Sequence, residues 1–263
     1  MKYLLGSIIT VAFLLGNACG ARAQTEITLL APIPVGREML TNLIEGFENR
    51  TNDKVEVTFA EDSSDSEPFG TKQLVARGGD FDVSILLAPF PEALASGNIV
   101  AGSATTLARL VLAVTVRKGT PLPDISSPAA VKRMLLAAKS VSIVNPSEGR
   151  LGGEAMEVFK KLGIADQMQP KIKAVENSAL AEAAVAKGET DLFLGPQLSD
   201  KLAAGVDVFV VGGLPRGVST PIDVVGFVST HAIDPKAAKS LLQYLKSPEA
   251  EAFYKAAGML PAH

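Results

Sequence analysis

Strand-like and helix-like segments alternate along the chain, and this alternation is the strongest constraint on its fold. The run at 25–33 is apolar and of strand length, residues 38–47 carry apolar side chains at helical spacing, and 54–60 alternates like a strand. A short helical segment at 72–76 and a buried-strand run at 81–88 follow. Strands separated by helices in this order predict an α/β fold in which the helices cover the faces of a parallel sheet.

The alternation resumes after a long extended run at 108–119. Further strands are predicted at 140–144, 171–175, 191–195 and 206–213, and further helices at 123–138, 179–191, 235–247 and 247–258. Two extended runs, 108–116 and 221–229, stand where the chain must change halves. We therefore expect a two-lobed, clamshell-like protein with these runs as its hinge. Residues 24–108 plus 225–263 would form lobe 1, and residues 109–224 would form lobe 2.

The first 23 residues have the layout of a secretory signal peptide. Lys2 precedes an apolar run that is too short to span a bilayer, and Ala21-Arg22-Ala23 resembles a cleavage site. We expect cleavage after about Ala23 and export to the periplasm. The single cysteine, Cys19, would be removed with this segment, and lipidation of Cys19 is the alternative.

The charge and the residue inventory exclude several function classes. Removal of Lys2 and Arg22 changes the formal net charge from −3 to −5, which argues against a nucleic-acid partner. The chain has neither a GxxxxGK phosphate loop nor a GxSxG elbow, and it has only two histidines. We therefore expect no metal and no cofactor, and we expect a monomer. The acidic stretch at 61–67 is interpreted as a solvated loop.

The stretch NPSEGRLGG at 145–153 joins a predicted strand to a predicted helix. Ligands of open α/β sheets bind beyond the carboxyl ends of the strands, where unpaired helix N–H groups and the helix dipole favour anions. Ser147 can donate a hydroxyl, Arg150 can offer a planar fork to a carboxylate, and Gly152 and Gly153 can leave their amides accessible. In the alternative interpretation, the glycines only form a tight turn and Arg150 points into water.

The order of motifs resembles that of the type II periplasmic solute-binding proteins, and within them the molybdate-binding proteins of ABC importers. The matching segments are ITLLAPIPVGREML, GGDFDVSILLAP, ARLVLAVTVRKGTPLPDISSP, NPSEGRLGGEAMEVFKKLGI, VENSALAEAAVAKGETDLFLG and SLLQYLKSPEAEAFYKAAGM. The resemblance implies two lobes, each a mostly parallel sheet flanked by helices, with a two-strand hinge and a ligand between the lobes. The residues expected to contact the ligand are Val35, Gly36, Arg37, Gly70, Thr71, Ser147, Arg150, Gly152, Gly153, Ser178 and Gln197.

Three positions depart from the molybdate-binding pattern. Pro34 stands near the place of an expected hydroxyl residue, the loop TFAEDSSDSEPFGT is longer and acidic, and Gly195-Pro196-Gln197 replaces an expected tyrosine. These departures argue against molybdate as the ligand and leave the fold unaffected.

A narrower resemblance adds an enzymatic hypothesis. LAAKSVSI, the NPSxG-like turn, KLGIADQM and GGLPRGVST resemble a group similar to periplasmic aconitate isomerase, which has the same fold. That resemblance implies proton transfer on a tricarboxylate, for which Arg150 and Arg37 could form a cationic cradle. No residue stands out as the catalytic base. Glu148 is one candidate, although a glutamate near a helix N-terminus is commonly a cap or a partner of the helix dipole. His231 and His263 are expected at the surface.

Two functions therefore remain open. In the first, the protein captures a small anion, an organic carboxylate or an oxyanion, in the interlobe cleft and presents it to the permease of an ABC importer. In the second, it interconverts cis- and trans-aconitate.

Overall fold

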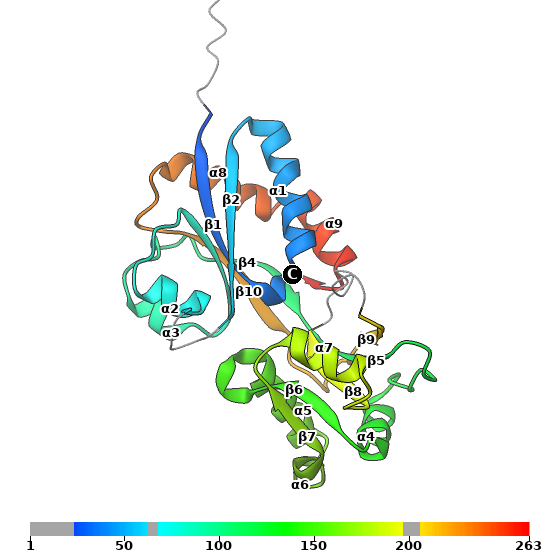
Figure 1. Ribbon diagram of the computed structural model, residues 1–263. Helices are drawn as coiled ribbons and strands as arrows, with labels where there is room; N and C mark the ends of the chain where they lie inside the picture. The colour runs from blue at the N-terminus through cyan, green and yellow to red at the C-terminus, as the bar shows by residue number, and fades with distance from the viewer. Residues whose placement is uncertain (1–23, 63–67, 197–205, 263) are drawn as a thin grey trace, which may run out of the picture.

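The computed structural model of the protein describes residues 24–62, 68–196 and 206–262 (Figure 1). The predicted signal peptide and Gln197 lie outside these residues. Within the described part of the chain, no helix is both long enough and apolar enough to cross a membrane.

One lobe is built on a six-stranded sheet with the strand order β11-β4-β10-β3-β1-β2. Its strands are β1 (Glu26–Pro32), β2 (Lys54–Ala60), β3 (Val83–Leu87), β4 (Thr105–Leu110), β10 (Ile222–Val228) and β11 (Leu260–Pro261). β1 pairs in parallel with β2 and β3, whereas β10 runs antiparallel between β3 and β4. The sheet is therefore mixed, and its parallel part is the trio β2-β1-β3.

Helices cover both faces of this sheet because neighbouring strand residues point to opposite sides. The helices of this lobe are α1 (Arg37–Thr51), α2 (Thr71–Ala76), α3 (Pro91–Ala95), α8 (Pro235–Leu245) and α9 (Pro248–Ala256). Leu29 and Ile85 belong to the core cluster that α1 and α8 complete. The adjacent Leu30 and Leu86 belong to a separate cluster with α2 and α3 (Figure 1).

The other lobe is built on a five-stranded sheet with the strand order β7-β6-β8-β5-β9. Its strands are β5 (Leu112–Arg117), β6 (Val141–Val144), β7 (Ile172–Val175), β8 (Leu192–Pro196) and β9 (Val208–Gly213). Its helices are α4 (Pro128–Ala137), α5 (Arg150–Lys161), α6 (Ala165–Met168) and α7 (Ser178–Ala186). β6 pairs in parallel with β7 and β8, and β5 pairs antiparallel with β8 and β9, so this sheet is also mixed.

The chain crosses between the sheets twice. The first crossing passes from β4 to β5 through Val111, and the second lies between Gly213 and Ile222. The extended run predicted at 108–116 is thus two strands in different sheets, and the run at 221–229 contains β10 of the six-stranded sheet. The two-lobed α/β fold is confirmed, while the lobe boundaries at 108/109 and 224/225 stay predictions.

The helix starts of the second lobe differ in how they are capped. Ser127 caps α4 and Asn177 caps α7, each by accepting a hydrogen bond from a backbone N–H in the first turn. The N-cap residue of α5 is Gly149, which has no side chain to cap the helix, and the first turn of α5 contains no acidic residue. The orphan N–H groups of α5 therefore depend on acceptors from elsewhere in the molecule.

Candidate functional site

A small cavity lies where the two lobes meet, and we call it the interlobe cleft. It is lined by Pro34, Glu61 and Asp62 of the first lobe and by Val144, Gly149, Arg150, Leu151, Glu176, Asn177 and Ser178 of the second. These residues follow the carboxyl ends of β1, β2, β6 and β7 or begin helices α5 and α7. Its volume is about 20 Å³, roughly the space of one water molecule. The cleft thus occupies the edge of both sheets at which α/β proteins bind ligands.

A carboxylate from the first lobe caps helix α5 of the second. Asp62 Oδ2 accepts a hydrogen bond from the backbone N–H of Arg150 at 3.4 Å. Gly149 has a φ of 145°, which only glycine adopts readily, and a Cβ there would lie 3.0 Å from Asp62 Oδ2. Gly149 therefore allows both the unusual backbone conformation before α5 and the close approach of the Asp62 carboxylate.

Asp62 is buried, with 5% of its surface exposed. Its Oδ2 forms an ion pair with Lys72 Nζ at 3.0 Å. Burial raises the pKa of the Asp62 carboxyl above its ordinary value, while Lys72 and the Arg150 N–H oppose that rise. Oδ1, the other carboxylate oxygen, has no hydrogen-bond partner among the described residues. The interpretation of 61–67 as a solvated loop is therefore wrong for Asp62.

Gly70 and Thr71, both predicted ligand contacts, lie at the start of α2, and Thr71 holds the Asp62 loop in place. The Thr71 N–H donates to the Glu61 carbonyl at 2.8 Å, and the Thr71 hydroxyl donates to the Asp62 carbonyl at 3.1 Å. These contacts position the backbone of Glu61 and Asp62 at the mouth of the cleft.

Arg150 lines the cleft but is engaged with α5. Its Nη2 lies 2.9 Å from Glu154 Oε2, one helical turn further on. Glu154 is buried, and its other oxygen accepts from the Thr220 N–H at 2.5 Å and the Ser219 hydroxyl at 3.2 Å. Ser219 and Thr220 belong to the second crossing between the lobes. Arg150, with 27% of its side chain exposed, therefore links the start of α5 to that crossing.

The two glycines of α5 meet different surroundings. A Cβ on Gly152 would overlap the Val144 carbonyl oxygen and lie 2.8 Å from the Asn145 carbonyl carbon. Gly152 thus lets α5 pack directly on the end of β6. A Cβ on Gly153 would have only Arg150 Nη1 within 4 Å, at 3.9 Å, so this position has room for a side chain.

Helix α7 brings a second amino end to the cleft. The Asn177 side chain accepts from the Leu180 N–H at 3.0 Å and satisfies one orphan donor. Ser178, the first residue of α7, has a buried Oγ without a hydrogen-bond partner among the described residues. The cleft therefore contains an unpaired hydroxyl from one lobe and an unpaired carboxylate oxygen from the other.

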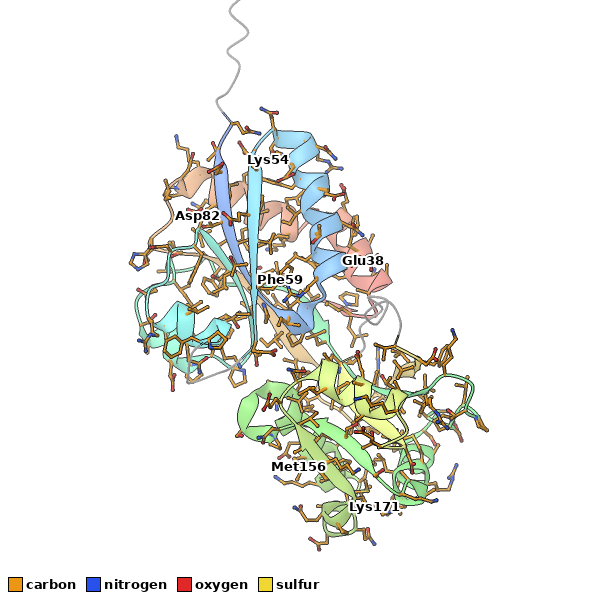
Figure 2. All side chains as sticks on the ribbon, in the orientation of Figure 1. Glu38, Lys54, Phe59, Asp82, Met156 and Lys171 are labelled. Carbon is orange, nitrogen blue, oxygen red and sulfur yellow. The ribbon has the colours of Figure 1, made fainter. Side chains whose placement is uncertain are left out.

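The remaining predicted residues of the first lobe surround Pro34, which itself lines the cleft. Val35 is fully buried in the core, and Gly36 has a φ of 97° at the start of α1. The Arg37 guanidinium lies 4.6 Å from the ring centroid of Phe59, beside the start of α1 (Figure 2). Arg37 is thus stacked on an aromatic ring at the surface.

Ser147 is exposed in the short 3₁₀ helix before α5, and its N–H donates to Asn145 Oδ1 at 3.2 Å.

Of the residues predicted to contact the ligand, Arg150 and Ser178 line the cleft. His231 is exposed, as predicted, and its Nε2 hydrogen-bonds with Asn98 Oδ1 at 3.0 Å; it is not among the residues that line the cleft. The Glu148 side chain and His263 lie outside the described part.

Asp62, Glu176 and Asn177 line the cleft but were absent from the predicted set. Asn177 had a sequence signal, because an Asn before an apolar helical pattern is a typical N-cap. Asp62 had a weaker signal, because it stands in the loop TFAEDSSDSEPFGT at a ligand position of the molybdate-binding pattern, but the acidic composition of that stretch predicts solvated charges.

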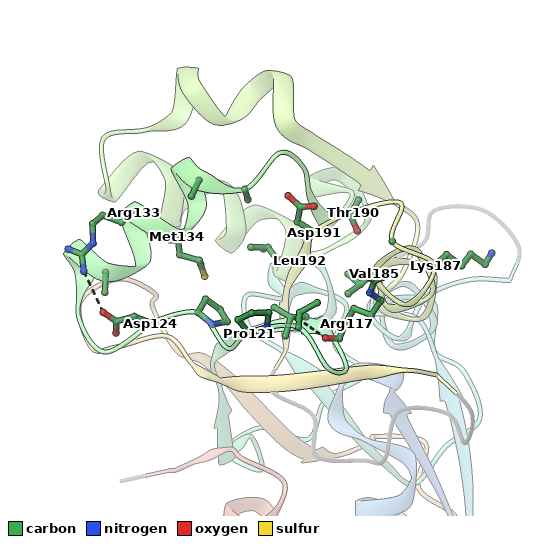
Figure 3. Close-up of a pocket in the computed structure, with 17 residues that line it drawn as sticks. Arg117, Pro121, Asp124, Arg133, Met134, Val185, Lys187, Thr190, Asp191 and Leu192 are labelled. Carbon is green, nitrogen blue, oxygen red and sulfur yellow. Dashed lines mark hydrogen bonds and ion pairs between the residues drawn. The ribbon is translucent and has the colours of Figure 1, made fainter.

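A larger cavity, of about 700 Å³ and open to solvent, lies on the second lobe (Figure 3). Its walls are α4, the loop after β5 and the start of β8, and the carboxyl ends of α4 and α7 face it. Those helix ends carry the negative end of the dipole, to which Arg117 and Lys187 in the wall are complementary. The cleft, with two helix amino ends, therefore suits an anion better than this larger cavity.

Comparison with known proteins places the chain in a family. The model of the bacterial extracellular solute-binding proteins matches residues 32–260. The aconitate isomerase of a Pseudomonas species is 28% identical over 243 residues, which is 91% of this chain and 90% of that protein. The molybdate-binding protein ModA of Azotobacter vinelandii is 30% identical over 250 residues, 92% of each chain.

The fold agrees with these matches. The solved structure of the Azotobacter vinelandii periplasmic molybdate-binding protein superposes with a TM-score of 0.71 at 20% identity, covering 89% of this chain and 98% of that one. The resemblance drawn from the motifs is thus confirmed, and the chain belongs to the bacterial extracellular solute-binding proteins.

Proposed function

We propose that this solute-binding protein captures a small anion, an organic carboxylate or an oxyanion, between its lobes and delivers it to an ABC importer. One observation carries the proposal: at the amino end of α5, the Arg150 N–H already donates a hydrogen bond to a carboxylate, that of Asp62, at 3.4 Å. Backbone N–H groups and the dipole at a helix start favour such groups on any molecule.

The start of α7 supports the same ligand class. The Ser178 hydroxyl is available to donate to an anion, and it lines the cleft with Arg150. The present cleft holds about one water, so a larger ligand requires the lobes to separate and to close again around it. Such hinge closure is a common response of two-lobed proteins to ligands.

Delivery to an importer also requires export, and we propose that the mature protein is a periplasmic monomer that starts after about Ala23. The mass of the protein recovered from the periplasm tests the cleavage site, and its sedimentation tests the oligomeric state.

A thermal-shift and calorimetric screen tests the anion hypothesis. Its probes are cis-aconitate, malate, succinate, hydrogen phosphate, sulfate and molybdate, with glucose and lysine as neutral and cationic controls. A ligand at about 100 times its Kd stabilises the folded state by about 2.7 kcal/mol, which is easily seen as a rise in melting temperature. Stabilisation by a control compound while all anions fail would overturn the proposal.

The isomerase is the second candidate function, and two observations favour it. The Pseudomonas aconitate isomerase aligns over 91% of this chain. In addition, Asp62 is a buried carboxylate on the cleft whose pKa burial raises, as a general base working near neutral pH requires. In this hypothesis, Asp62 takes a proton from the carbon next to the double bond, the double bond shifts, and the protonated Asp62 gives that proton to the former alkene carbon.

Incubation with cis-aconitate separates the two functions. A binding protein returns the compound unchanged, whereas an isomerase produces trans-aconitate. Activity that survives in Asp62→Asn would remove Asp62 from the catalytic role.

A further inference from the structure

We propose that Asp62 selects anions that carry an O–H group, a selection that rests on the proposed capture of an anion in the cleft. The O–H of the ligand donates to Asp62 Oδ1, while its negative charge meets the helix amino ends and the Ser178 hydroxyl. Hydroxycarboxylates and protonated oxyanions share this chemistry.

The two carboxylate oxygens of Asp62 differ in their hydrogen-bond partners. Oδ2 has Lys72 Nζ at 3.0 Å and the Arg150 N–H at 3.4 Å. Oδ1 is buried and unpaired among the described residues. A buried carboxylate oxygen without a donor is costly, so a ligand that supplies a donor gains more than one that does not.

The residues that line the cleft carry an excess of negative charge. Three of the residues that line it, Glu61, Asp62 and Glu176, are acidic. The nearby cations are already engaged, because Lys72 pairs with Asp62 and Arg150 pairs with Glu154. A fully deprotonated oxyanion would therefore bring its oxygens against Asp62 with no proton between them, and like charges at such distances repel.

The Asp62 carboxylate is held in a fixed position at the start of α5. Gly149 leaves no side chain between α5 and Asp62, and Thr71 and Lys72 hold the Asp62 backbone and carboxylate in place. An acceptor fixed in this way discriminates between ligands, because a site that hydrogen-bonds an O–H group leaves its own polar atom unpaired when the analogue lacks that group. The raised pKa of the Asp62 carboxyl agrees with a site in which a proton lies between it and the ligand.

Matched ligand pairs test the selection in the wild-type protein. Calorimetry compares malate with succinate, which lacks the hydroxyl, and hydrogen phosphate with sulfate, which carries no proton at neutral pH. In the pair that the cleft accepts, the O–H ligand should bind about tenfold to a hundredfold more tightly. A preference for malate over succinate would identify the ligand class as hydroxycarboxylates, and a preference for hydrogen phosphate over sulfate would identify it as protonated oxyanions.

Two variants separate hydrogen bonding from simple charge. Asp62→Asn can keep an oxygen towards Lys72 and turn an N–H₂ donor towards the ligand, so the preference should vanish or invert. Glu61→Gln removes one negative charge from the adjacent residue and should strengthen the binding of both members of a pair alike, leaving their ratio unchanged. Melting temperatures show that each variant is folded.

The outcomes distinguish this inference from the proposed function. Equal binding of both members of each pair by the wild-type protein overturns the selection, because a bound water then satisfies Oδ1. A ratio that is unchanged in folded Asp62→Asn overturns it as well. Failure of every anion in the wider screen overturns the anion function itself.

Discussion

Asp62 and Arg150 belong to different lobes, and the Asp62 carboxylate caps helix α5, which begins at Arg150. Asp62 Oδ2 lies 3.4 Å from the backbone nitrogen of Arg150. α5 has no capping side chain and no acidic residue of its own in its first turn. The contact therefore supplies, from across the cleft, the negative charge that a helix start favours. It marks the place where we expect the negative group of the ligand.

The two glycines of α5 should respond in opposite directions to substitution by alanine. Gly152→Ala places a methyl group against the Val144 carbonyl and should destabilise the protein by about 3 kcal/mol. Gly153→Ala meets only Arg150 Nη1, at an ordinary contact distance of 3.9 Å, and should stabilise it by about 0.5–1 kcal/mol, because alanine favours a helix more than glycine does. Urea unfolding of both variants measures the difference, and similar midpoints would contradict the packing role of Gly152.

Removal of the Arg150 side chain should affect folding as well as binding. Arg150→Ala leaves the buried Glu154 carboxylate without its closest cation, which should cost about 1–3 kcal/mol of stability given the partial exposure of the arginine. The double variant Arg150→Ala/Glu154→Gln keeps an acceptor for the Thr220 N–H and should recover much of the loss. Chemical denaturation tests this, and a double variant no more stable than Arg150→Ala would show that the ion pair is not the cause.

Glu182 on α7 should make stability depend on pH. Burial raises the pKa of its carboxyl from 4.5 to about 7. The stability that Glu182 contributes is therefore fully present below pH 4.5 and is lost as the pH rises through about 7. Glu182→Gln should change little at pH 4.5 and should stabilise the protein by about 1–2 kcal/mol at pH 8.5, a value reduced for the partial exposure of the side chain.

The control for this prediction is Glu189→Gln, which removes an exposed glutamate just beyond the same helix. Thermal unfolding at the two pH values measures both variants. An equal effect of Glu182→Gln at both pH values would contradict the proposed burial of the charge.

The sequence predicted correctly which of the longer segments are helices and which are strands, because hydrophobic periodicity depends only on nearby residues. The helical spacing at 38–47 lies within α1 (Arg37–Thr51), and the alternation at 54–60 is β2. The helix α3 (Pro91–Ala95) and the strand β11 (Leu260–Pro261) are too short to produce such a pattern. The run at 108–119 contains a change of sheet at Val111, which strand propensity does not record.

The candidate site was predictable only in part. Helix starts after buried strands can be found in the sequence, and two of the predicted residues, Arg150 and Ser178, do line the cleft. The state of Asp62 depends on Lys72, ten positions away, and on Arg150, 88 positions away in the other lobe. No local pattern encodes these partners, so composition suggested a solvated charge where the structure has a buried one.

The central claim is that the anion binds in the interlobe cleft, and a pair of leucine substitutions tests it most directly. Ser178→Leu fills the cleft, whereas Ala137→Leu puts the same side chain into the larger cavity of the second lobe. Calorimetric titration uses malate, cis-aconitate and hydrogen phosphate with both variants and the wild-type protein. We expect at least one of these anions to bind the wild-type protein and Ala137→Leu equally well, and folded Ser178→Leu at least tenfold more weakly. Unchanged binding by Ser178→Leu together with loss in Ala137→Leu would place the ligand in the larger cavity and contradict the account.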